Sequence, residues 1–243
     1  MTRASWNNKE LYRKIMILGA MGAFFMMLGD LTLSVITPCD TDQGLFLRQA
    51  YYDGEYPAWR LIALFLTGVV GIFGYWYGLQ AMHDSIDVRY SKARKCFQFS
   101  GMLFCFSGLA IHFGIGMGAY LTSYMAGNYG KEAAIKAAED YANKVLPGFY
   151  ILYLPIAAIF IIHIIMLIAG KTIYSRRMVL FAPILWMGIF GLIPDIRQEI
   201  GSHLVTLDYV CTQCSGNAAP LLYFLACLFL PDGFKYGKER FEK

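Results

Sequence analysis

Charged side chains are scarce in this sequence. Asp, Glu, Lys and Arg together make up 16% of the residues, whereas a soluble domain carries roughly a quarter of such residues. Hydrophobic residues account for 57% of the chain, and the mean hydropathy is +0.46. This composition excludes an ordinary soluble globular domain.

Several chemical signatures are also missing. The chain contains neither a G-x-x-x-x-G-K-[ST] nor a G-x-G-x-x-G motif, so nothing in it indicates nucleotide binding. It also lacks H-E-x-x-H, the compact zinc-binding motif of metalloproteases. The net charge is only +4, and we interpret this small basic excess as a topology signal. No nucleic-acid partner is expected.

Long apolar runs take the place of these motifs. A membrane-spanning helix needs about 20 predominantly apolar residues. The runs predict six spans, at about 14–37, 60–82, 97–121, 148–169, 178–193 and 204–230. The fold class expected is an all-α polytopic transmembrane bundle, with residues 1–243 forming a single integral membrane domain. A cleavable signal peptide is the competing interpretation of the first run, but that run is too long and no small-x-small site follows it.

The positions of Lys and Arg predict the orientation of these spans. Basic residues in short loops favour the cytoplasmic side of a membrane. They cluster in the N-terminal arm, in the second and fourth connections and in the C-terminal tail. Both termini are therefore expected in the cytoplasm, with the protein in the plasma membrane. These clusters should also attract anionic lipids at the cytoplasmic face of the bilayer.

The segments assigned to the outer side have a different character. The first outer loop is aromatic, and its Tyr51, Tyr52, Tyr56 and Trp59 are expected to anchor it at the membrane interface. The alanine-rich stretch 131–144, between spans 3 and 4, predicts a short extracellular helix. Span 3 itself is rich in Gly and Ser, and such small residues let neighbouring helices approach closely.

One carboxylate interrupts the first span. Asp30 is the only charged residue between Ile15 and Cys39, and it lies roughly 10 Å below the predicted outer end at 1.5 Å per residue. His112 lies at a similar predicted depth in span 3. An intramembrane carboxylate is costly and should face the bundle or a wet cavity, so Asp30 is a functional-site hypothesis. The alternatives are an Asp bonded for structural reasons and a His satisfied by packing.

A second polar group follows the fifth span. Asp195, Glu199 and His203 occur at successive i, i+4 positions and would share one helix face. Together with Asp30 and His112, Glu199 and His203 could hold a divalent metal such as zinc, because His and carboxylate ligands suit that ion. The alternative is a solvated amphipathic turn at the interface.

The sequence assigns provisional roles to these groups. Asp30 or Glu199 would act as general base, with His112 as acid or metal ligand, in a membrane-embedded hydrolase. Asp208, Ser215 and Asn217, on the sixth span, are candidate substrate-binding residues. Ser215 is either a nucleophile or, more simply, bonded to a helical carbonyl. Pro220 is expected to kink this span.

Three cysteines are candidates for a disulfide. Cys211 and Cys214 form a C-x-x-C at the outer end of the sixth span, and Cys39 lies in the first outer loop. Disulfides are permitted on the outer side of a membrane. Cys39 could pair with either residue of the motif, while free thiols, redox chemistry and a metal site remain open alternatives.

Short stretches of the chain resemble a known group of proteins. "LGDLTL" ends the first span, "HFGIG" lies in the third and "GNAAPLLYF" in the last. In these stretches the sequence resembles uncharacterised bacterial multipass membrane proteins classed as domains of unknown function. The resemblance implies a membrane protein and carries no activity.

Three functions are compatible with these observations. In the first, an outward-facing pocket binds or processes a small or lipid-like molecule, with or without a metal. In the second, Asp30 takes up a proton or cation in a transporter or channel, for which homo-oligomerisation would help to form a path. In the third, the polar groups serve only packing in an assembly, immunity or sensor protein.

Overall fold

The computed structural model describes residues 9–34, 49–199 and 205–230. Regular secondary structure in these three segments is helical, apart from one isolated bridge between Ile86 and Thr172. The helices are α1 Lys9–Ser34, α2 Gln49–Tyr52, α3 Ala58–Ser85, α4 Ser91–Tyr129, α5 Lys131–Lys144, α6 Leu146–Tyr150, α7 Tyr153–Ile168, the 3₁₀ helix η2 Arg176–Phe181, α8 Pro183–Glu199 and α9 Val205–Phe229. The predicted all-α class is confirmed.

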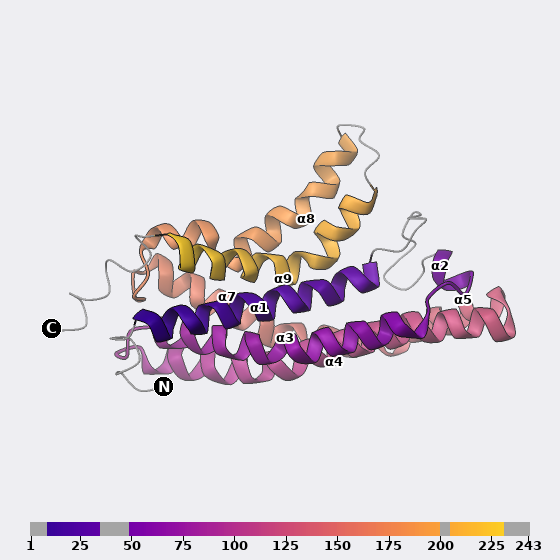
Figure 1. The fold of residues 1–243 in the computed structure, drawn as a ribbon, viewed down its shortest axis with the longest axis horizontal. Coiled ribbons are helices and arrows are strands. Elements are labelled where there is room, and N and C mark those ends of the chain that lie inside the picture. Colours follow the sequence, from indigo (N-terminus) through magenta and orange to yellow (C-terminus); the bar gives the residue numbers. More distant parts are fainter. Residues whose placement is uncertain (1–8, 35–48, 200–204, 231–243) are drawn as a thin grey trace.

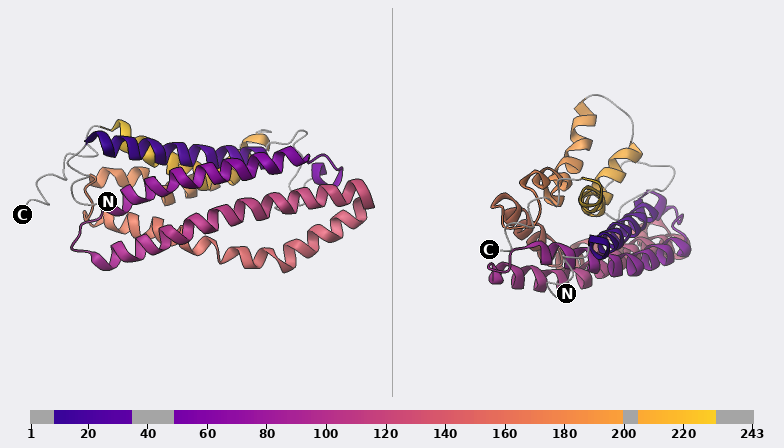
Figure 2. Two further views of the ribbon diagram at one scale, coloured as in Figure 1. Left: turned by 60° about the horizontal axis from the view of Figure 1, so that its bottom comes forward. Right: turned by 60° about the vertical axis from the view of Figure 1, so that its left-hand side comes forward.

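The long helices lie side by side along one axis. α3 packs between α1 and α4, α9 packs along α1, and α7 packs along α4. α8 projects away from the bundle and contacts α9, which returns to it (Figures 1 and 2). α1 begins and α9 ends at the same end of the bundle (Figure 1).

α1 and α3 are in backbone contact along a seam of glycines. A Cβ atom added at Gly22 would lie 2.3 Å from the Tyr75 nitrogen and 2.5 Å from the Gly74 carbonyl carbon. One added at Gly19 would lie 2.8 Å from the Gly78 Cα. Small residues at a helix interface permit this approach where lipid supplies no hydrophobic driving force. We call Gly19, Gly22, Gly71, Gly74 and Gly78 the glycine seam.

Large apolar side chains cover the outside of the bundle. Within the described residues, five helical segments are long and apolar enough to cross a membrane: Glu10–Leu33, Ala58–Ser85, Ser91–Tyr129, Pro147–Ile168 and Arg176–Ile193. Exposed residues on these helices include Phe73, Phe99 and Phe106. Such a continuous apolar surface is typical of a protein that faces lipid. α9, which corresponds to the sixth predicted span, carries Gln213, Ser215 and Asn217 and is not among the five segments found in the described part of the chain.

The C-terminal part of α4 extends further than predicted. The helix continues without a break past residue 121 to Tyr129, and α5 folds back against it (Figure 1). The predicted helix at 131–144 is confirmed as a helix. The glycines of α4 pack against side chains of neighbouring helices and not against their backbones. A Cβ at Gly114 would meet the Phe149 ring, and one at Gly116 would meet the Leu64 side chain.

The aromatic residues of the first outer connection are mostly inside the protein. Tyr51, Tyr52 and Tyr56 are buried. The prediction that they anchor the loop at the membrane interface is therefore wrong for these three. Tyr51 and Tyr56 stack edge to face and join Leu33 and Ala119 in a small outer core, where their rings bury more apolar area than they would at the interface. Trp59 is exposed, and its place at a membrane interface stays a prediction.

Two prolines lie within helices. α8 extends to Glu199 and so passes position 194, where the fifth span was predicted to stop. Membrane helices tolerate proline because neighbouring groups can satisfy the freed backbone carbonyl. α9 contains Pro220 and is bent along its length (Figure 1), which agrees with the predicted kink, since proline removes one helical hydrogen bond.

At the end of the bundle where α1 begins, two connections are joined by backbone hydrogen bonds. The Asp87 nitrogen donates to the Lys171 carbonyl at 2.9 Å, and the Ile173 nitrogen donates to the Ser85 carbonyl at 2.9 Å. Arg94 adds a bond from Nη1 to the Ile86 carbonyl at 2.7 Å. The two connections therefore form one unit.

Asp87 gives this unit a predictable response to acid. Hydrogen bonds from the Arg89 side chain hold the pKa of the Asp87 carboxyl below its usual range. A lowered folded pKa means that this stabilisation is complete above the unfolded pKa, about 3.9, and is lost as pH falls through the folded value. We expect thermal stability to fall below about pH 4, and Arg89→Gln to reduce that dependence. Melting curves against pH test this, with Arg177→Gln as a control that should keep the parent slope.

Candidate intramembrane site

Asp30 is held by residues from two other helices. Its Oδ2 accepts a hydrogen bond from Asn217 Nδ2 of α9 at 2.7 Å. Its Oδ1 lies 3.3 Å from His112 Nε2 of α4. The Asp30 side chain is 14% exposed in the absence of lipid, so the carboxyl is enclosed but not sealed.

Tyr75 fixes the orientation of Asn217. The Tyr75 hydroxyl, on α3, donates to Asn217 Oδ1 at 3.0 Å, and this leaves the amide nitrogen to face Asp30. Tyr75 is itself fully buried and packs edge to face against Phe104 and Phe224. The donor to Asp30 is thus positioned by a tyrosine that cannot move without disturbing the core.

The environment of His112 determines which ring nitrogen carries the proton. Among the described residues none bonds the buried Nδ1 atom. An N–H at Nδ1 would be a buried donor without an acceptor, which costs more than an unpaired lone pair. In the neutral ring we therefore place the proton on Nε2, which lies 3.3 Å from Asp30 Oδ1. Gly29 makes room for the ring, since a Cβ there would lie 3.1 Å from Nδ1.

The site lies close to the C-terminal end of α1 and the N-terminal end of α3. Arg60, in the first turn of α3, donates from Nη1 to the Thr32 carbonyl at 2.8 Å. Thr32 is two residues beyond Asp30, or about 3 Å along the helix axis. From Lys14 to Asp30 the rise is about 24 Å, most of the roughly 30 Å hydrocarbon thickness of a bilayer.

The hairpin of α4 and α5 returns to the level of the site. The Tyr141 hydroxyl of α5 donates to the Gly114 carbonyl of α4 at 2.8 Å. The ring of Phe149, in α6, fills the space beside Gly114. Gly114 is two residues beyond His112, so α5 and α6 pack against α4 at about the height of the site.

Several predicted site residues cannot be placed. The side chains of Glu199 and Asp208, and the whole of His203 and Cys39, lie outside the described residues. The four-ligand metal site and the Cys39 disulfide thus stay predictions. Within the described part of the chain, no three His, Cys, Asp or Glu side chains gather as metal ligands would. Cys211 and Cys214 are buried in α9, and Ser215 is half-buried there.

A second polar cluster lies further along α9, toward its C-terminal end. His163 Nε2 of α7 is 2.6 Å from the Tyr223 hydroxyl of α9, and the hydroxyls of Tyr12 and Tyr174 are 2.5 Å apart. His163 also packs edge to face against the rings of Tyr223 and Tyr174. We call these four residues the tyrosine–histidine cluster. All four are buried.

Sequence reasoning did not identify Tyr75 or the tyrosines of this cluster as site residues. One signal was available, because a tyrosine within an apolar span must find a partner for its hydroxyl. Tyr75 lies in such a span between Gly74 and Gly78. Its partner, however, is on the last helix, and no spacing in the sequence points to it.

A model of one protein family matches the chain over residues 6–231, and that family is described as a family of unknown function, DUF6796. No curated protein matches the chain, and no solved structure does. The matched region contains the glycine seam, the groups around Asp30 and the tyrosine–histidine cluster.

Proposed function

We propose a function for this chain, which belongs to the family of unknown function DUF6796, from the contacts of its intramembrane carboxyl group. The protein binds a small or lipid-like molecule that carries a cationic group, such as a protonated amine, at Asp30. The ligand reaches the site from the outer leaflet. Asn217 and His112 hold the carboxylate in place, and Tyr75 holds Asn217.

One observation carries this proposal: among the described residues the oxygens of Asp30 face Asn217 and the ring of His112, and no Lys or Arg lies within ion-pair distance of them. Asn217 donates to Oδ2, and a neutral His112 with its proton on Nε2 would direct that N–H toward Oδ1, so neither residue supplies a fixed positive charge. A carboxylate in a membrane costs at least ~2.5 kcal/mol on insertion scales. Two neutral donors orient the group and reduce this cost, and the remaining negative charge favours a cation.

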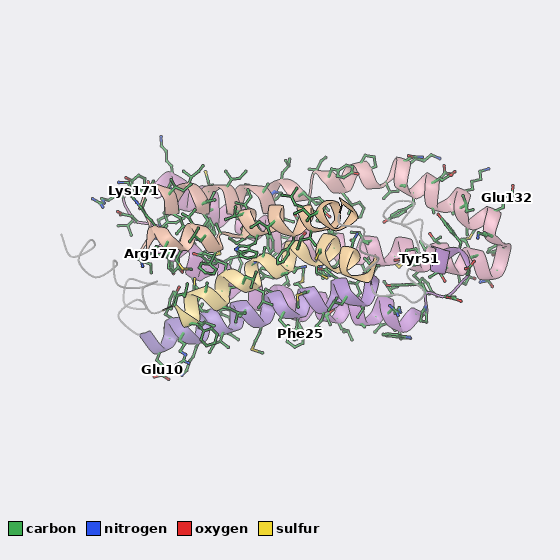
Figure 3. The ribbon with its side chains drawn as sticks, turned by 90° about the horizontal axis from the view of Figure 1, so that it is seen from above. Glu10, Phe25, Tyr51, Glu132, Lys171 and Arg177 are labelled. Carbon is green, nitrogen blue, oxygen red and sulfur yellow. The ribbon has the colours of Figure 1, made fainter. Side chains whose placement is uncertain are left out.

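The same proposal includes the full topology. We propose that α9 is a sixth span, so that an even number of crossings brings both termini to the cytoplasmic side of the plasma membrane. The arrangement of charge supports this orientation. Lys171 and Arg177 lie at one end of the molecule, and Glu132 and the buried Tyr51 lie at the other (Figure 3).

Carbodiimide labelling tests the proposed site. Dicyclohexylcarbodiimide is an apolar reagent that modifies carboxyl groups it can reach from the bilayer. In purified protein reconstituted in nanodiscs, we expect it to modify Asp30, as read by peptide mass spectrometry. Octylamine should slow the reaction severalfold by occupying the site, and octanol, which has the same chain without the charge, should not.

Two comparisons make the labelling interpretable. Asp84 is a buried carboxyl at the opposite end, paired with Arg94, so any labelling there should not respond to octylamine. Asp30→Asn removes the reactive group and should leave that peptide unmodified. Equal labelling of Asp30 with octylamine and with octanol would contradict the choice of a cationic ligand. Absence of Asp30 labelling would contradict access from the lipid.

A proton- or cation-coupled transporter is a second candidate, and the tyrosine–histidine cluster favours it. Ionisable groups inside a membrane commonly mark proton or ion pathways. α9 contributes Asn217 to one polar group and Tyr223 to the other, so a single helix links the two. Cation flux into proteoliposomes that survives Asp30→Asn would remove this candidate.

A further inference from the structure

The end of the molecule where α1 begins carries a positively charged surface with a fixed backbone. It consists of residues 84–95 and 171–177, and we call it the basic platform. Its exposed basic side chains are Arg89, Lys92, Lys95, Arg176 and Arg177. The question is whether this surface is only a topology signal or a binding site.

The backbone of the platform is cross-linked and does not behave as two separate loops. Antiparallel pairing at Ile86 and Thr172 joins the two segments, with hydrogen bonds on either side of it. Ser175 accepts a bond from the Arg177 nitrogen at 3.2 Å and so begins the η2 helix. The cationic side chains therefore project from a surface whose backbone is already ordered.

The acidic residues of the platform are already paired. Asp84 Oδ1 lies 3.2 Å from Arg94 Nη2, and Asp87 is bonded by Arg89. These are the only acids in the two segments. Lys92, Lys95, Arg176 and Arg177 consequently have no acid of the platform left to neutralise them.

Apolar residues border the charges. Val88 and Leu180 are exposed next to Arg89 and Arg177, respectively. An anionic lipid presents the matching pattern, with a phosphate beside acyl chains. Each Lys or Arg near an anionic membrane surface adds to the attraction.

We infer that the basic platform binds the phosphate-bearing head groups of anionic lipids. This inference is independent of what Asp30 binds. It gives a reason for the pairing of two connections so far apart in the sequence: the paired backbones bring the cations of both to the same end of the bundle.

Thermal denaturation in mixed micelles tests the inference. We expect phosphatidylglycerol to raise the melting temperature relative to phosphatidylcholine. A variant with Lys92→Gln, Lys95→Gln, Arg176→Gln and Arg177→Gln should lose most of this shift. The matched control removes three cations from the opposite end, Lys131→Gln, Lys136→Gln and Lys144→Gln, and should keep it.

Further arms separate the alternatives. Inorganic phosphate added without lipid should give no comparable shift; if it does, the platform is a site for free phosphate and the lipid inference is wrong. Equal losses in the platform variant and the control variant would show nonspecific charge attraction and would also overturn it. If the fourfold variant does not fold, Arg176→Gln with Arg177→Gln serves as the milder test, and an unchanged shift in it counts against the inference.

Discussion

Replacing Gly22 by alanine is expected to destabilise the protein by about 3 kcal/mol, at the upper end of the usual cost of overpacking. The added methyl would lie 2.3 Å from the Tyr75 nitrogen, 2.5 Å from the Gly74 carbonyl carbon and 2.7 Å from the Gly71 oxygen. All three atoms belong to the α3 backbone, which cannot rotate away as a side chain can. Relief requires α1 and α3 to separate, and that would also disturb the nearby packing of Met26 against Gly71.

The melting temperature in detergent measures this effect, and α8 offers a matched control. A Cβ added at Gly188 or Gly191 meets nothing within 4 Å among the described residues. Since alanine favours helix by up to about 1 kcal/mol over glycine, Gly188→Ala should be neutral or slightly stabilising. Equal melting temperatures for Gly22→Ala and Gly188→Ala would mean that the glycine seam does not hold α1 against α3.

The second large effect is expected at Asn217. Its replacement by alanine removes the 2.7 Å hydrogen bond to Asp30 and leaves the Tyr75 hydroxyl without its acceptor. Hydrogen bonds to charged groups contribute about 1.5–3 kcal/mol, so a loss of that size is expected. Tyr75→Phe removes only the orienting bond and should cost about 1 kcal/mol.

A double-mutant cycle separates the hydrogen bond from general packing damage. In an Asp30→Leu background there is no carboxylate for Asn217 to bond. The loss of unfolding free energy caused by Asn217→Ala should therefore fall by more than half. Chemical denaturation of the single and double variants gives the coupling energy. If the two substitutions simply add, Asn217 does not stabilise the charge of Asp30 and acts only by filling space.

The sequence contained enough information to locate much of this site. A single aspartate in an apolar run, Asp30, needs polar partners. His112, in the small-residue span, was a candidate because it lay at a similar predicted depth. Their contact was inferred because both residues were placed at a similar depth. The depth of His112, however, was counted from a predicted helix end near residue 121, and α4 continues to Tyr129. α4 continues to Tyr129 because α5 packs along it outside the bundle, and this packing is a tertiary effect that hydropathy does not reveal.

Other features depended on contacts distant in the sequence. Tyr75 and Asn217 are separated by most of the chain, and either one alone reads as an isolated polar residue. The buried position of Tyr51 and Tyr56 arises from packing on α4 and α1, whereas composition alone suggested lipid anchors. The close approach of helices was expected at the small residues of the third span, whereas the backbones that touch are those of α1 and α3, where Gly19 meets Gly78 and Gly22 meets Gly74.

The order of the helices along the chain has a consequence for biogenesis. The glycine seam joins the first two long helices, α1 and α3, so this pair can form as soon as both have entered the membrane. Asn217 belongs to the last helix and is synthesised nearly two hundred residues after Asp30. During synthesis the carboxyl of α1 therefore lacks this partner until α9 has been translated. Truncation before α9 should leave an intermediate that insertion quality control can distinguish from the finished protein.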